Sequence, residues 1–118
     1  MIRLCSRKWF NEHNCTTDHN YSIDCDDNFG LKVLSDLQPS RGLIEFYKLN
    51  PTRFDLFAEG YNRELESAEV QKTLIFIEYC WKKNISVNLV CSCDDYRNCH
   101  RYLISQMLLN RGVSCQCI

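Results

Sequence analysis

The feature that most constrains this fold is an apolar segment that runs directly into a polar turn and then into a helical pattern. Residues 86–91 read Ser-Val-Asn-Leu-Val-Cys, which is typical of a buried strand. Apolar residues recur at helical spacing between Tyr102 and Leu109. Open α/β sheets bind their ligands beyond the carboxyl ends of such strands, where the next helix begins. The turn over residues 91–101 is therefore the expected place for a functional site.

The rest of the chain predicts further strands and helices around this unit. Short strands are expected over residues 2–5, 21–25 and 113–118. Helix starts are indicated by Ser40, by the pair Asn50-Pro51, by Ser67 and by Asn98. Gly112 stands where a left-handed residue ends the last helix. This order predicts a single α/β domain over residues 1–118, with a short, mostly parallel sheet flanked by helices.

Composition narrows the classes of function. The chain has 118 residues, a formal net charge of −1 and nine cysteines. The small net charge argues against attraction of the whole surface to nucleic acid or to a membrane. We recognise neither a secretory signal nor an apolar run near the ~18 residues of a membrane span. We therefore expect a cytoplasmic protein without a membrane partner, whose cysteines are free, metal-bound or reactive rather than paired in disulfides.

The first candidate site lies at the expected start of the last helix. With Asn98 as the helix cap, Cys99, His100 and Arg101 occupy the first turn, where free backbone N–H groups and the helix dipole favour an anion. This position predicts a lowered pKa for Cys99 and a role for His100 as acid or base. We expect Arg101, with Arg97 nearby, to bind a phosphate or carboxylate. Packing and loop-tying roles for the same residues remain the alternative.

A second group of candidates surrounds the end of the strand. Cys91 and Cys93 face the same side of an extended chain, and Cys91 lies where a nucleophile meets a ligand held by the helix end. Asp24, Asp26 and Asp27 follow another predicted strand. Asp24 is a candidate to face the same crevice, although turn formation after the strand is the favoured explanation of these acids.

A metal site is the competing interpretation of the same segment. Four side chains offer ligands that zinc prefers: Cys91, Cys93, Cys99 and His100. Their spacing is not the paired C-x2-C of zinc knuckles, and the adjacent Cys99 and His100 do not easily reach one ion. We therefore predict neither a metal nor a cofactor. Cys115 and Cys117 repeat the C-x-C spacing, and whether they lie near Cys91 and Cys93 depends on the strand order.

Two stretches resemble one known family. The segment from Cys91 to Arg101, a strand ending in Cys and a Cys-His-Arg triplet opening a helix, resembles the carboxyl motif of the domain-of-unknown-function 488 (DUF488) family. Residues 37–65 are similar to the middle of its short, YeaO-like branch. The resemblance implies a Rossmann-like domain and a phosphate-bearing ligand, a nucleotide or a nucleic acid, near the Cys-His-Arg helix. It implies no settled activity.

The sequence also departs from that family. The short members carry an Arg-rich turn after an early strand, whereas residues 24–30 of this chain read Asp-Cys-Asp-Asp-Asn-Phe-Gly. Acids thus replace a basic wall of the expected pocket. The departure suggests a diverged member, of viral or mobile-element type, that has kept the fold and lost the ancestral activity.

These observations leave three possible functions, which experiments can distinguish. The first is an enzyme for hydrolysis or group transfer, with Cys91 or Cys99 as nucleophile, His100 as acid or base and Arg101 as anion anchor. The second is a non-catalytic module that binds a nucleotide, a nucleic acid or a host protein. The third is a small domain stabilised by a metal held by Cys and His. The sequence predicts no particular oligomeric state.

Overall fold

One parallel sheet forms the centre of the molecule. The computed structural model describes residues 1–13, 19–25, 28–93 and 95–118. The strands are β1 (Ile2–Ser6), β2 (His19–Ser22), β3 (Lys32–Val33), β4 (Val87–Cys91) and β5 (Cys115–Cys117). They lie in the order β3-β2-β4-β1-β5, and every pair of neighbours is parallel. The predicted α/β fold with a short parallel sheet is confirmed.

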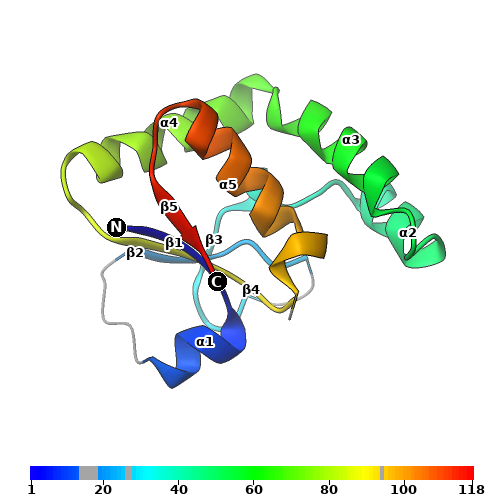
Figure 1. Ribbon diagram of the computed structural model, residues 1–118, viewed down its shortest axis with the longest axis horizontal. Coiled ribbons are helices and arrows are strands. Elements are labelled where there is room, and N and C mark those ends of the chain that lie inside the picture. Colours follow the sequence, from blue (N-terminus) through cyan, green and yellow to red (C-terminus); the bar gives the residue numbers. More distant parts are fainter. Residues whose placement is uncertain (14–18, 26–27, 94) are drawn as a thin grey trace.

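The helices cover the two faces of the sheet unequally. They are α1 (Arg7–Glu12), α2 (Arg41–Leu49), α3 (Phe54–Leu65), α4 (Ala68–Lys82) and α5 (His100–Asn110), with short 3-10 turns η1 (Ser35–Leu37) and η2 (Tyr96–Asn98). Figure 1 shows α3, α4 and α5 on one side of the sheet and α1 on the other. Among the described residues, no helix is both long and apolar enough to cross a bilayer.

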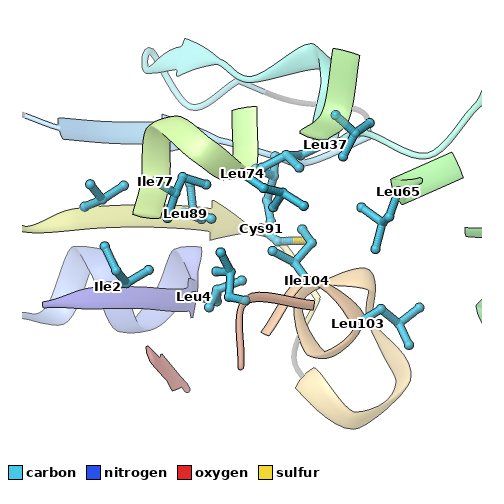
Figure 2. Packing of buried hydrophobic residues seen from close by; sticks show 14 of the residues in the cluster. Ile2, Leu4, Leu37, Leu65, Leu74, Ile77, Leu89, Cys91, Leu103 and Ile104 are labelled. Atoms are coloured by element: carbon cyan, nitrogen blue, oxygen red, sulfur yellow. The ribbon is translucent and has the colours of Figure 1, made fainter. Parts of the chain in front are cut away.

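The main core lies between the sheet and the helices α4 and α5. Successive side chains of a strand point to opposite faces, so Leu89 and Cys91 of β4 share the face that the larger helices cover. Figure 2 shows these two side chains beside Leu4 of β1, Leu74 of α4 and Ile104 of α5. All five are at most 1% exposed. The strand that carries the predicted site is therefore anchored on both edges and packed on this face.

Several helix boundaries agree with the sequence signals. The Ser40 hydroxyl accepts the backbone N–H of Leu43, and the Ser67 hydroxyl accepts that of Val70. These bonds satisfy N–H groups that lack partners within the helix. Gly112 follows α5 with a φ of +80°, the left-handed conformation predicted for that position.

The predicted helix start at Asn50-Pro51 is wrong. Asn50 instead ends α2, because its side-chain amide and its backbone N–H both donate to the Phe46 carbonyl. Pro51 lies in the turn that follows, and α3 begins at Phe54 after Arg53. An Asn before a Pro suits both ends of a helix, and here the preceding helix uses it.

Two boundaries near the amino terminus also differ from the sequence prediction. The sequence prediction has no helix before Ser40, whereas the structure forms α1, capped by the Ser6 hydroxyl, which accepts the Trp9 N–H. Strand β2 covers residues 19–22 rather than 21–25. Ile23 still donates to the carbonyl of Val90, after which the chain leaves the sheet, so Asp24 lies just beyond the sheet edge. Asp26 and Asp27 lie outside the described residues.

Helices α2 and α3 approach closely at a glycine. A Cβ atom added to Gly60 of α3 would lie 2.8 Å from a methyl carbon of Leu43 in α2. The helix thus tolerates a residue of low helix propensity because the neighbouring side chain occupies that space. The Ser40 N–H and hydroxyl also donate to the Glu64 carboxylate, which ties the start of α2 to the end of α3.

Candidate functional site

A small cavity opens at the carboxyl end of β4, between the exit of β2 and the start of α5. Its volume is about 150 Å³. Its reactive lining comprises Asp24, Cys91, Cys93, Cys99 and His100, and Ile44, Tyr47 and Phe57 supply much of its apolar wall. Five predicted site residues therefore meet one space: Asp24, Cys91, Asn98, Cys99 and His100.

Three sulfur atoms gather on one side of this cavity. The Sγ atoms of Cys91, Cys93 and Cys99 all lie within 4.8 Å of one another. The distance between the Cys91 and Cys99 sulfurs is 3.5 Å. Cys91 and Cys99 are almost fully buried, whereas Cys93 is exposed. We call these three residues the thiol cluster. Cys93 was not among the predicted catalytic residues, although its place two residues after Cys91 pointed to the same face.

The turn η2 brings the third thiol back to the strand end. The Asp95 carboxylate accepts the Arg97 backbone N–H and the Asn98 side-chain amide, which folds residues 96–98 into a 3-10 turn. The prediction of Asn98 as helix cap is wrong by one residue, because Asn98 is held by Asp95 and Cys99 becomes the cap of α5. Asn98 still lines the cavity.

His100 is fixed so that one ring nitrogen faces the thiol cluster. Its Nε2 lies 2.7 Å from the carbonyl oxygen of Ile23, which only accepts hydrogen bonds. Nε2 therefore carries the proton, and Nδ1, 3.6 Å from the Cys99 sulfur, presents a lone pair. Burial lowers the pKa of His100, so the ring is neutral. The Tyr61 ring packs edge-on against the His100 ring, with 5.6 Å between the ring centroids.

Asp24 organises the loop that carries Cys93. Its carboxylate accepts the Ser92 backbone N–H at 3.0 Å and the Ser92 hydroxyl at 2.6 Å. The Cys91 thiol also points at this carboxylate, with 3.5 Å between sulfur and oxygen. Asp24 is 5% exposed, so these donors replace the water that the charge loses on burial. Ser92 had no role in the sequence prediction.

The thiol cluster concentrates negative charge on its exposed member. Donation from the Cys91 and Cys99 S–H groups lowers the pKa of Cys93, and the positive charge of Arg101 acts in the same direction. The pKa of Cys91 rises because its proton is held by Cys93 and Cys99. A hydrogen bond from Cys91 lowers the pKa of Cys99, but donation to Cys93 and burial outweigh it and raise the pKa. The predicted lowering at Cys99 is therefore wrong, since donation to a neighbouring thiolate and burial exceed the effect of the helix terminus.

The two predicted anion-binding arginines lie outside the cavity lining. Arg101 is 0% exposed. Among the described residues, none offers an acceptor within hydrogen-bonding distance of its three guanidinium nitrogens. Arg97 is largely exposed and pairs with the Asp95 carboxylate at 3.5 Å. In this structure Arg101 therefore acts on the site through its charge rather than by contact with a cavity-bound ligand.

A second, more polar hollow adjoins the cavity. It has a volume of about 320 Å³ and shares Cys25, Ile44 and Lys48 with the first space. Arg41 and Glu45 also lie on its wall, where their side chains pair at 3.9 Å. Arg41, Ile44 and Lys48 recur at helical spacing on α2, a signal that marks one helix face in the sequence. The sequence prediction missed both cations because nothing placed that face beside the thiols.

Comparison with known families gives one match. A family model described as the active DUF488-N3 subclade matches residues 13–112, which include every residue of the cavity named above. The chain belongs to the DUF488 family. The predicted family is thus confirmed, and the narrower placement in the YeaO-like branch stays a prediction. No curated protein and no solved structure matches the chain.

Proposed function

We propose that this DUF488 protein binds a phosphate-bearing ligand, a nucleotide or a nucleic-acid end, and carries out cysteine-dependent hydrolysis or group transfer on it. One observation carries the proposal: three thiols and a neutral imidazole share a cavity that adjoins a hollow with two cationic side chains. A cavity that combines a nucleophile, a base and an adjoining binding surface suits covalent catalysis. The family model's description as active points the same way.

The exposed sulfur is the proposed attacking atom. Cys93 is the only member of the thiol cluster classed as exposed, and a ligand in the cavity reaches it without movement of the core. The Cys99 sulfur lies 3.6 Å from Nδ1 of His100 and within 4.8 Å of the Cys93 sulfur, so Cys99 and His100 share a proton beside the nucleophile. Cys91 and Cys99 thus support the Cys93 thiolate. As its sulfur bonds to the electrophilic atom of the ligand, the bond from that atom to the leaving group breaks, and the leaving group takes the proton that Cys99 shares with His100. In hydrolysis, water then displaces the Cys93 sulfur, and a proton from that water restores Cys99.

The adjoining hollow, with two cationic side chains and the Glu45 carboxylate on its wall, is the proposed place for the phosphate. Arg41 and Lys48 lie on its wall, and Lys48 also borders the cavity. Lys and Arg side chains are the usual partners of phosphate oxygens. A ligand whose phosphate lies there extends its reacting group into the apolar cavity, toward Cys93. This arrangement replaces the role that the sequence suggested for Arg101.

Protection from alkylation tests binding and site together. Reduced protein is treated with limiting iodoacetamide, with and without inorganic phosphate, AMP, ATP or a short single-stranded DNA, and the labelled cysteines are identified by mass spectrometry. We expect Cys93 to be labelled first and at least one phosphate-bearing probe to slow its labelling. The doubly substituted Arg41→Ala, Lys48→Ala protein should lose this protection, whereas Lys72→Ala on α4 should keep it. Absence of protection by all four probes contradicts the proposed ligand class.

The same variants separate an enzyme from a binding module. A Cys93→Ser protein that retains ligand-induced thermal stabilisation, but forms no covalent adduct with any reactive probe, has lost only the nucleophile. If wild-type protein binds the probes yet forms no adduct and turns over none of them, the site binds without catalysis. That result would favour the non-catalytic module expected as the alternative.

A further inference from the structure

We propose that the thiol cluster is also a binding site for one thiophilic metal ion, with Zn²⁺ as the best fit, and that the bound ion blocks its thiol chemistry. The metal site itself does not depend on the proposed function, whereas its effect on the reaction does. The argument rests on the positions of three sulfurs and one buried arginine.

The spacing of the sulfurs fits one ion. A Zn–S bond of about 2.3 Å in a tetrahedral site places two sulfur ligands about 3.8 Å apart. The Cys91 and Cys99 sulfurs are 3.5 Å apart, and no two sulfurs of the thiol cluster are more than 4.8 Å apart. Small rotations about the Cα–Cβ bonds close the remaining difference. Cys91 is the last residue of the central strand, Cys99 is the cap of α5, and Cys93 lies in the loop after the strand, so two of the three ligands rest on elements packed into the core.

The fourth ligand position stays open toward the cavity. Among the described residues, the ligand atoms that lie within 4.8 Å of one another are the three sulfurs, without a His100 nitrogen. Nδ1 of His100 lies 3.6 Å from the Cys99 sulfur. This agrees with the expectation that Cys99 and His100 do not easily reach one ion. Since all three sulfurs line the cavity, water or a ligand completes the coordination there, as in zinc sites with an open position.

The buried arginine supplies the charge that such a site needs. Three thiolates and one divalent cation leave one negative charge in excess. Arg101 is fully buried, lacks a hydrogen-bond partner among the described residues and acts electrostatically on Cys93. A buried guanidinium without a partner is costly because it cannot be neutralised by losing its proton. A negatively charged metal–thiolate centre beside it offsets that cost.

The ligand set also selects the kind of metal. Thiolates favour soft or borderline cations such as Zn²⁺ and Cu⁺, whereas Mg²⁺ and Ca²⁺ prefer oxygen ligands. A site with three thiolates and one open position therefore favours Zn²⁺ over the common alkaline-earth ions. When Zn²⁺ holds the Cys93 sulfur, that sulfur no longer attacks an electrophile.

Metal titration of the full chain tests the site directly. Reduced, metal-free protein is titrated with Zn²⁺ in competition with a chromophoric chelator, and separately with Co²⁺ while thiolate-to-cobalt absorption is recorded. We expect one ion per chain and a thiolate absorption band. Cys93→Ser should weaken Zn²⁺ binding by more than the roughly 10–100-fold that loss of an outer-shell partner costs. The matched controls, Cys80→Ser and Cys117→Ser, lie outside the cluster and should bind as the wild type does.

Two outcomes would overturn the metal site: no thiolate–cobalt band, or Zn²⁺ affinity that survives Cys93→Ser. Cys93 is exposed, so its substitution leaves the core intact and keeps the test valid if the buried variants Cys91→Ser or Cys99→Ser fail to fold. Zn²⁺ should also prevent alkylation of Cys93. If Zn²⁺ binds while no phosphate-bearing probe protects Cys93, the proposed function fails and the metal site stands. If a nucleotide protects Cys93 and Zn²⁺ does not bind, the metal site fails and the proposed function stands.

Discussion

Two Cys-x-Cys segments of this chain have the same spacing and different environments. Cys91 and Cys93 lie at the end of β4, the central strand of the sheet. Cys115 and Cys117 lie along β5, an edge strand, and β1 separates the two strands. Strands β4 and β5 are therefore not neighbours in the sheet. The topology does not support the disulfide or shared site between the two cysteine pairs that the sequence left open.

The environment, and not the spacing, gives one pair its chemistry. Cys91 and Cys93 gain a third thiol and an imidazole from the start of α5 and a buried carboxylate from the exit of β2, two other parts of the chain. Cys115 instead points its thiol at the backbone carbonyl of Ser105. Burial raises the pKa of Cys115, and that of Cys117 to about 11. Burial thus raises the pKa of both thiols of the edge pair, whereas the neighbouring thiols lower the pKa of Cys93 in the central pair.

The largest expected contrast is in stability. Leu89→Ala removes a fully buried side chain from the central strand, so the free energy of unfolding should fall by about 2–5 kcal/mol. Cys117→Ala removes one half-buried atom from the edge strand and should cost less than about 1 kcal/mol. Urea denaturation followed by circular dichroism measures both. Equal losses would mean that β5 is as important to the core as β4.

The next contrast concerns the carboxylate beside the central pair. Asp24→Asn weakens two charge-assisted hydrogen bonds from Ser92, which should lower the free energy of unfolding by about 1–3 kcal/mol. Asp95→Asn, at an exposed turn, is the control and should cost less than about 1 kcal/mol. The same denaturation assay applies. A larger loss for Asp95 would assign the order of this region to η2 rather than to Asp24.

The two cysteine pairs should also differ in their rates of alkylation, an effect smaller than the stability differences above. Cys93 should react with iodoacetamide at neutral pH at least about tenfold faster than Cys115 or Cys117, because it is exposed and its thiolate is stabilised. Timed labelling with peptide mass spectrometry measures the three rates in one sample. Similar rates at all three sites would remove the distinction between the pairs.

The smallest expected contrast is the effect on stability of replacing two helical glycines, which again depends on their surroundings. Gly42→Ala in α2 meets no atom within 4 Å and should stabilise the protein by up to about 1 kcal/mol through helix propensity. Gly60→Ala in α3 gains the same propensity but presses on Leu43, so its net effect should be zero or destabilising. Thermal denaturation of the two variants is the measurement. A clear gain at Gly60 would show that Leu43 moves freely.

Local sequence signals were sufficient wherever short-range chemistry decides the structure. The capping hydroxyls of Ser40 and Ser67 and the left-handed Gly112 act within one helical turn, so their residues alone predicted these boundaries. The apolar run before Cys91 likewise predicted a buried strand with a site at its end. The signal failed at Asn50 and Asn98, where a neighbouring element competes for the same side chain.

The sequence by itself determined the family, the parallel α/β class and the location of the thiols and imidazole at one strand end. Only the tertiary structure decided that Cys93 is the exposed thiol, that Arg101 is buried behind the site and that Arg41 and Lys48 border the adjoining hollow. The physical reason is the distance along the chain over which each interaction acts. Helix caps and strand patterns depend on near neighbours, whereas burial, charge sharing and cavity lining depend on which distant segments the packing brings together.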